Sequence, residues 1–182
     1  DWGLTADAIL ALSSRKVAAT AAAAATDALE ANVRSYISPS GGDTRSAGAV
    51  AKVALVAQVQ GRDATTFKDV DLIANLGSLK STTTPNAGRF RDNNAGADYS
   101  GTFSQSLALL ALSRWGAVPA DSVQWLVGLQ CPNGGYPFSP NETTGQCAGD
   151  ADADHDATAM AIQAFVASGV SSQPGVSAAI SK

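Results

Sequence analysis

Glycine turns recur at a fixed spacing along this chain, and a fixed-period repeat limits the possible folds more than any other feature of its sequence. Gly42, Gly88 and Gly134 follow one another at steps of 46 residues. Each turn leads through a polar loop into an apolar segment that ends at a further glycine, namely Gly61, Gly116 and Gly169. The spacing therefore predicts three helix–turn–helix units over residues 31–169, with half units at residues 1–13 and 176–180.

The two helices of each unit differ in their pattern of apolar residues. The second helix, expected over residues 45–60, 102–115 and 156–168, is apolar nearly all round, which is typical of a helix buried on several sides. The first helix is amphipathic, as in residues 67–76, where apolar side chains stand at every third position between charged ones. Residues 17–37 belong to the same type and contain an alanine run that favours helix. The pattern predicts an all-α fold in two layers, without a significant sheet.

Four of these helical segments have a residue that favours a helix start, either just before the segment or near its beginning. These residues are Thr5, Ser100 or Thr102, Pro119 and Asp156. We therefore expect these side chains to cap or begin their helices.

The composition excludes several classes of protein. Hydrophobic residues make up 45% of the 182 residues and charged residues 15%, so the chain is too apolar for intrinsic disorder. The formal net charge is −4 and the basic residues are scattered, which argues against a nucleic-acid partner. No apolar run is long enough to span a membrane. Alanine accounts for 36 residues, which fits closely packed helices.

Two cysteines, Cys131 and Cys147, lie in one polar loop rich in glycine, proline and asparagine. They are either free buried thiols or a disulfide, and their polar neighbours favour the disulfide. A disulfide indicates an oxidising compartment, so we expect a secreted or cell-surface protein. A zinc site needs more thiol or imidazole ligands than this loop provides.

The third unit resembles a known repeat. Its segments Trp125–Gln130, Pro132–Tyr136 and Asp154–Phe165 are similar to the repeat of squalene and terpene cyclases and of protein prenyltransferase β-subunits, which joins an aromatic-plus-Gln helix end, a Gly-Gly-aromatic turn and an Asp-x-x-Thr-Ala helix start. In this joint we expect positive φ at the turn glycine and packing of the following aromatic ring. We also expect Gln130 to hydrogen-bond the backbone of the joint.

The resemblance implies an α/α toroid, a ring that usually contains six helix pairs. Residues 1–182 then form a single partial α/α-toroid domain of about 46-residue repeats, close to half of a ring. The chain is interpreted as a processed or excised fragment, or as one that assembles with another copy or with the missing half of the toroid.

The acidic run before the last helix has more than one interpretation. Asp154 and Asp156 match the first and middle acids of the catalytic motif of class II terpene cyclases, whose third acid is replaced here by Ala157. Non-catalytic repeats of this kind also begin with an acid, which caps the helix. We favour the capping role, and Asp154 and Asp156 are catalytic candidates only in the cyclase alternative. His155, the one histidine of the chain, is interpreted as solvated.

The same run is also a weak candidate for calcium. Aspartates occupy every second position of this run, as at the start of an EF-hand loop; they are Asp150, Asp152, Asp154 and Asp156. The glycine and the final glutamate of an EF-hand loop are missing. We expect no cofactor, apart from calcium as this weak candidate, and no prenyltransferase zinc.

The candidates for ligand binding lie near the turns of the second and third units. They are Arg89, Phe90, Asp98, Tyr99 and Tyr136, of which the first four combine charged and aromatic side chains in the loop before the helix at 102–115. At the mouth of a toroid such residues would meet a ligand, whereas the alternative is a solvated loop with a helix-capping role.

The sequence thus predicts a secreted or cell-surface domain with a ligand-binding or scaffold role, whose partner is an unidentified small molecule or protein. The alternative is a terpene-cyclase- or prenyltransferase-like enzyme that acts on an isoprenoid, so whether the chain is an enzyme stays open. An α/α-toroid enzyme acting on glycans would need two converging carboxylates, and the sequence places no such pair.

Overall fold

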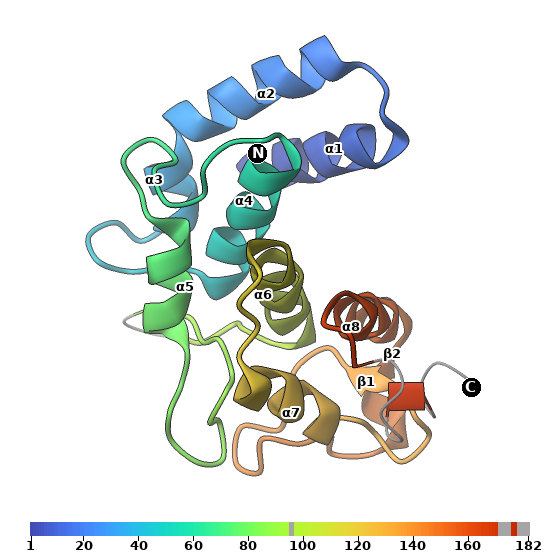
Figure 1. Cartoon of the computed structure of the whole chain (residues 1–182). Helices are drawn as coiled ribbons and strands as arrows, with labels where there is room; N and C mark the ends of the chain where they lie inside the picture. Colours follow the sequence, from blue (N-terminus) through green and yellow to red (C-terminus); the bar gives the residue numbers. More distant parts are fainter. Residues whose placement is uncertain (95–96, 171–175, 178–182) are drawn as a thin grey trace.

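The computed structural model describes residues 1–94, 97–170 and 176–177, and the described chain is mostly helical (Figure 1). This confirms the predicted all-α class. Its elements are α1 (Trp2–Arg15), α2 (Ala19–Ala31), α3 (Val33–Ile37), α4 (Ala47–Val59), α5 (Leu72–Leu79), α6 (Thr102–Trp115), α7 (Ala120–Gly128), β1 (Tyr136–Pro137), the 3-10 turn η1 (Asp150–Asp152), β2 (Ala153–Asp154) and α8 (His155–Ala167). The strands β1 and β2 pair antiparallel, with Tyr136 opposite Asp154.

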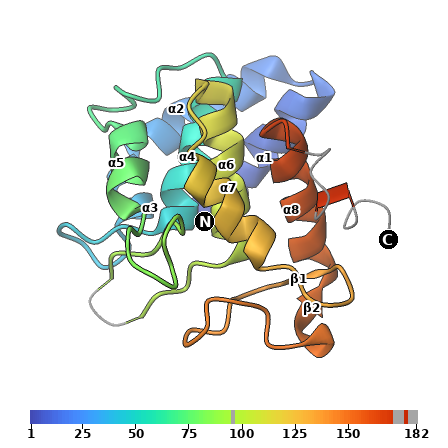
Figure 2. The same ribbon diagram turned by 60° about the horizontal axis from the view of Figure 1, so that its bottom comes forward.

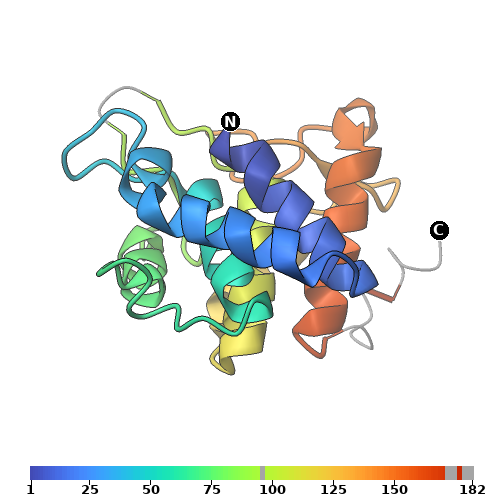
Figure 3. The same ribbon diagram turned by 90° about the horizontal axis from the view of Figure 1, so that it is seen from above.

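The helices form two layers. One layer is a row in which α1 packs on α4, α4 on α6 and α6 on α8. The other layer lies outside this row, with α2 against α1, α3 and α5 against α4, and α7 against α6 (Figures 1 and 2). Seen from above, α2 crosses over the row (Figure 3). No helix of the described part is long and apolar enough to cross a membrane.

Small side chains allow the inner helices to approach closely. In α4, Ala51, Ala54 and Ala57 are fully buried, and a Cβ at Gly48 would lie 2.9 Å from the Ser104 hydroxyl of α6. Gln58 of α4 donates a hydrogen bond of 3.1 Å to a carbonyl of α6. The alanines and the glycine of α4 therefore allow close helix packing in the inner row.

The glycine turns adopt the backbone conformation expected of them. φ is +91° at Gly88 and +90° at Gly134, and +69°, +86° and +71° at the glycines that follow α4, α6 and α8, which are Gly61, Gly116 and Gly169. L-residues with a side chain rarely adopt these values. The glycines thus set both the turns between helices and the ends of the inner helices.

The same joint is built twice, 46 residues apart. Phe90 and Tyr136 follow the two turn glycines and are fully buried. The backbone N–H of Phe90 donates to Gln105 Oε1 at 2.9 Å, and that of Tyr136 donates to Thr158 Oγ1 at 2.9 Å. Gln105 and Thr158 are each the fourth residue of their inner helix. Each aromatic ring is thus packed in the core while its backbone is fixed to the next inner helix.

Two outer helices differ from the prediction. The expected helix over 67–76 begins only at Leu72, because Lys68 and Asp69 have positive φ and the Asp71 carboxylate caps the Ala74 N–H at 2.7 Å. The expected segment 17–37 is divided at Asn32 into α2 and α3. Of the final half unit, residues 176–177 are helical, and 178–180 lie outside the described residues.

Several predicted caps are also wrong. α1 is capped by Asp1, whose carboxylate accepts from Gly3 N, and not by Thr5. α6 begins after Gly101 without a side-chain cap, because the Thr102 hydroxyl bonds the Pro137 carbonyl instead. Pro119 precedes α7 as its cap residue rather than as its first helical residue. The cap of α8 is described with the site below.

Replacing Gly88 by alanine should destabilise the protein more than the same change at Gly116. Both glycines have strongly positive φ, but a Cβ at Gly88 would lie 2.3 Å from the Asp121 carbonyl oxygen, whereas nothing lies within 4 Å of one at Gly116. We expect Gly116→Ala to cost about 1 kcal/mol of unfolding free energy and Gly88→Ala about 2 kcal/mol more, measured by urea unfolding. Equal losses would contradict the close approach of this turn to α7.

Candidate functional site

The acidic run ends in the cap of α8. Asp154 is the cap residue, and its Oδ1 accepts the Ala157 N–H at 2.7 Å. Its carbonyl oxygen accepts the Thr158 hydroxyl at 2.6 Å. Asp156, the expected cap, lies instead in the first turn of α8 and is exposed, as is His155. The acidic run therefore caps α8 as predicted, but through Asp154 and not through Asp156.

A pocket of about 480 Å³ lies beside this cap, where the Gly134 turn meets the start of α8. Asn133, Asp150, Asp154 and His155 border it. Asp150 Oδ1 accepts the Asn133 N–H at 2.7 Å, so this carboxylate fixes the turn. The side chains of Asn133 and Asp154 that border the pocket likewise hydrogen-bond the backbone around it.

The four aspartates proposed for calcium do not gather their carboxylates around one point. Within residues 1–94, 97–170 and 176–177, no group of three or more histidine, cysteine, aspartate or glutamate side chains is placed to hold a metal ion. Asp150 and Asp154 each accept a backbone N–H, while Asp152 is exposed.

The predicted disulfide is present. Cys131 and Cys147 are bonded with their Cα atoms 5.2 Å apart, and they close a loop over residues 131–147. Gln130, which precedes the loop, donates 3.0 Å to the Gly134 carbonyl, as expected for the joint.

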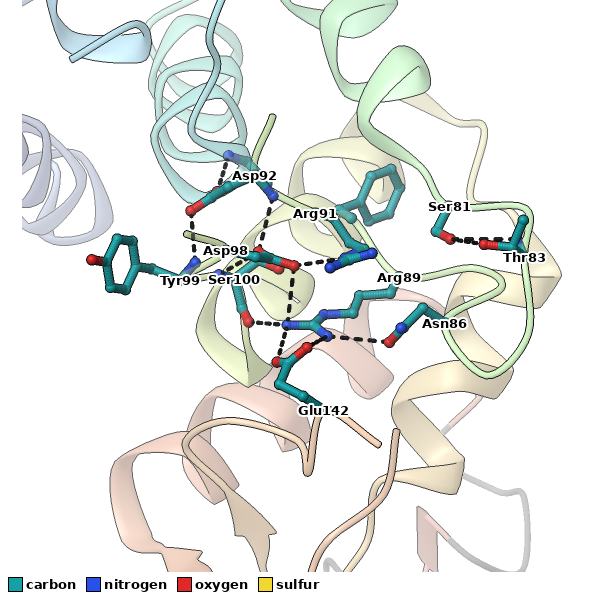
Figure 4. A network of polar contacts seen from close by, with 12 residues as sticks. Ser81, Thr83, Asn86, Arg89, Arg91, Asp92, Asp98, Tyr99, Ser100 and Glu142 are labelled. Atoms are coloured by element: carbon teal, nitrogen blue, oxygen red, sulfur yellow. Dashed lines mark hydrogen bonds and ion pairs between the residues drawn. The ribbon is translucent and has the colours of Figure 1, made fainter. Parts of the chain in front are cut away.

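A buried guanidinium lies at the centre of a network of polar contacts (Figure 4). The side chain of Arg89 is 1% exposed. It donates to Asn86 Oδ1 at 3.1 Å, to the Ser100 carbonyl at 2.5 Å, and to Glu142 Oε1 and Oε2 at 3.2 and 3.4 Å. Asp98 Oδ2 is 3.5 Å away. One cation thus joins the turn at Asn86, the loop before α6 and the disulfide loop.

Asp98 is the second centre of this network. Its carboxylate accepts Arg91 Nε at 2.6 Å and the backbone N–H groups of Asp92 and Ser100 at 3.1 and 3.0 Å. Burial alone would raise its pKa, but the hydrogen bonds from Ser100 and Arg91 and the charge of Arg89 outweigh burial, so the pKa of Asp98 lies below its ordinary value. The carboxylate is held in its charged form.

The network also reaches the inner row. Asp92 Oδ1 accepts the Ala47 N–H of the first turn of α4 at 2.7 Å, and its Oδ2 accepts the Tyr99 N–H at 3.1 Å. The loop of the second unit therefore caps the helix of the first unit. This contact joins two successive repeats.

The five ligand candidates occupy very different places. Arg89, Phe90 and Tyr136 are buried, and burial raises the pKa of the Tyr136 phenol. The Asp98 side chain is 13% exposed and belongs to the network of Arg89, whereas Tyr99 is 78% exposed. Arg89 and Asp98 are brought together, whereas Tyr136 belongs to the other joint.

Sequence reasoning missed Glu142 and Gln105. Glu142 lies 53 residues after the arginine that it binds, in a loop without regular structure, so no local pattern marks it. Gln105 bridges Phe90 N–H with the Gly88 and Ser122 carbonyls. In the sequence its only signal is a glutamine within a mostly apolar helix.

Comparison of the chain with models of protein families, with curated proteins and with solved structures found no match.

Protonation of Asp98 at low pH should account for part of the loss of unfolding free energy in acid. Because its folded-state pKa lies below the unfolded value of about 3.9, its charge contributes stability that is complete above that pH and is lost as the pH falls towards the folded pKa. We expect Asp98→Asn to cost about 2 kcal/mol at pH 6, since it removes charge from the side chain paired with Arg91 and Arg89. Between pH 6 and pH 3 the variant should lose less further stability than the unaltered protein.

Urea unfolding at both pH values measures this difference. Asp152→Asn is the matched control, because Asp152 is exposed and outside the network, and it should follow the unaltered protein. An unchanged pH dependence in Asp98→Asn would contradict the role of this carboxylate.

Proposed function

We propose that the chain is a ligand-binding or scaffold domain of the α/α-toroid type, secreted or at the cell surface. Support comes from the inner row with its outer layer, from the joint built twice at a 46-residue spacing, and from the disulfide. A disulfide is typical of proteins in oxidising compartments.

One observation carries the non-catalytic role: the carboxylate of Asp154 is occupied as a helix cap, while Asp156, which matches the middle, proton-donating acid of the cyclase motif, is exposed on the first turn of α8. A cyclase acid must present its proton to an alkene or epoxide in an apolar, enclosed cavity. Here the neighbouring pocket is bordered by Asn133, Asp150 and His155 and by glycine backbone. This pocket is open to solvent and has charged and polar groups on its border, which differs from the enclosed apolar cavity that an isoprenoid substrate requires.

A second copy, or the missing half of a toroid, is the proposed protein partner. The end helices of the inner row carry exposed apolar residues, with Leu4 of α1 67% exposed and Val166 of α8 58% exposed. Covering them would remove apolar surface from water. Sedimentation equilibrium of this chain tests the copy, and a compact monomer at all concentrations would contradict that assembly.

Substitutions at Asp154 distinguish a cap from a catalytic acid. Asparagine also caps helices, so Asp154→Asn should keep the unfolding free energy within a few tenths of a kcal/mol, while Asp154→Ala should lower it by about 1 kcal/mol. Asp156→Asn, at an exposed first-turn position, is the matched control and should change stability little. The measurement is urea unfolding followed by circular dichroism.

The activity test uses the same variants. The unaltered protein is incubated with squalene and, separately, with geranylgeranyl diphosphate, and the extracts are examined by gas chromatography and mass spectrometry. We expect both compounds to be recovered unchanged. A cyclised product that disappears in the folded Asp154→Asn or Asp156→Asn variant would establish the enzyme alternative and overturn the proposal.

A further inference from the structure

A pocket with two arginines on its border lies beside the first glycine turn. It has a volume of about 430 Å³ and is formed by α3 and the loop that follows it, with Arg34, Gly42 and Arg45 among its lining residues. Figure 1 shows this loop in light blue at the left edge of the molecule, next to α3. A Cβ at Gly41 or at Gly42 would meet no heavy atom within 4 Å, so the space in front of these glycines is free. The volume is within the range of small-ligand pockets.

Neutral groups hold the Arg45 guanidinium in one position. Its Nε donates to Asn75 Oδ1 at 2.8 Å, and its Nη1 donates to Ser38 Oγ at 2.7 Å. Nη1 also donates to the carbonyl oxygens of Thr44 and Gly42 at 2.7 and 3.1 Å. These partners orient the side chain, but none of them carries a negative charge. A side chain that is already fixed in this way loses little conformational entropy when it binds a ligand.

One end of this guanidinium remains available for a ligand. Arg45 Nη2 donates no hydrogen bond within the described chain, and it is not one of the unpartnered polar atoms that are buried there. Nη2 is therefore accessible to solvent. The backbone N–H of Gly42, which lines the same pocket, also has no acceptor among the described residues. Both groups are donors that an anionic oxygen can accept.

The charges of the two arginines are not neutralised by acidic side chains. Arginines elsewhere in the described chain, such as Arg62 and Arg89, form ion pairs with aspartate or glutamate. Arg34 and Arg45 form no such pair within the described residues. Arg34 is exposed, and its one hydrogen bond there, of 3.0 Å, goes to the Asp69 carbonyl oxygen. Two positive charges thus border one pocket in a chain whose formal net charge is −4.

The donors of this pocket fit a phosphate group better than other ligands. A phosphate monoester has three unsubstituted oxygens and carries about −1.5 to −2 charges near neutral pH, so it balances two arginines and accepts from several directions. A carboxylate has one charge and two oxygens in one plane, which suit a single guanidinium fork. A neutral or apolar ligand would remove water from both cations without replacing its hydrogen bonds, which is unfavourable.

We infer that this pocket binds a phosphate group with at least three unsubstituted oxygens, either the free ion or a monoester. Arg45 Nη2 and the N–H groups of Arg34 donate to its oxygens, and the Gly42 N–H is a third donor. The inference goes beyond the proposed function, because it uses neither the acidic run nor the ends of the inner row. It fails on phosphate binding alone, whereas the proposed function fails on isoprenoid turnover.

The test is a titration of the whole chain, in a buffer free of phosphate, with inorganic phosphate and separately with glycerol 3-phosphate. Nitrogen-15 NMR follows the backbone signal of Gly42 and the Nε signal of Arg45, and sodium chloride keeps the ionic strength constant. We expect both phosphates to shift these signals in a saturable manner, and acetate to bind about 10-fold more weakly or less. Tighter binding of glycerol 3-phosphate assigns the pocket to a phosphorylated molecule, and equal binding assigns it to the free ion.

The variant Arg34→Gln should weaken phosphate binding by about 10-fold, because it removes one of the two charges. Since Arg34 makes one hydrogen bond within the described chain, this change leaves the loop intact. Arg45→Lys keeps the charge but lacks the Nη2 donor, and it should also weaken binding. Arg114→Gln is the matched control, because Arg114 is an exposed arginine of α6 outside this pocket, and it should bind as the unaltered protein does.

Equal unfolding curves for the variants exclude loss of folding as the cause of weaker binding. The inference is overturned if neither phosphate moves the Gly42 signal at about 10 mM. It is also overturned if acetate binds as tightly as phosphate, or if Arg34→Gln binds phosphate as the unaltered protein does.

Discussion

A buried positive charge must be surrounded by acceptors, and this requirement organises the irregular half of the molecule. Removing one partner of a buried ion costs several kcal/mol, so the loops that supply oxygen atoms to Arg89 are restrained together. These loops are far apart in sequence, since they include Asn86, Ser100 and Glu142. Through Asp98 and Asp92 the same restraint extends to the first turn of α4. The helices of the inner row are held by apolar packing, whereas the connections that contain Asn86, Ser100 and Glu142 are joined by this one cation.

The repeat position of Arg89 shows how equivalent joints acquire different properties. In the next unit the residue 46 positions later is Gly135, where a Cβ would lie 2.8 Å from that of Ala153. The flanking glycine and aromatic positions are retained, and both aromatic N–H groups bond the fourth residue of an inner helix. One joint therefore contains a buried guanidinium, and the other leaves bare glycine backbone beside a polar pocket. The repeat determines the scaffold, while single substitutions within it determine where polar space arises.

Sequence reasoning was most successful where one physical effect dominates. The bounds predicted for α6 at 102–115 agree with the structure because apolar burial and a terminal glycine at Gly116 act together. It failed for α5, where the Asp71 cap and two residues with positive φ override an apolar spacing that fits a longer helix. For the site, the cysteine pairing was predictable from one loop, but the partnership of Arg89 with Glu142 was not, since it depends on the path of a loop that only the folded chain defines.

The disulfide loop links parts of the molecule that are distant in sequence. Over a span of 16 residues it contains the glutamate that binds Arg89 and the glycine that packs on Pro85. Closing the loop removes conformations from the unfolded chain, which stabilises the folded state by about 3 kcal/mol. Because Arg89 also lies against Trp125, the disulfide loop and the indole of α7 are joined through the same guanidinium. The closed loop keeps Glu142 beside Arg89, so the disulfide and the arginine network stabilise one another.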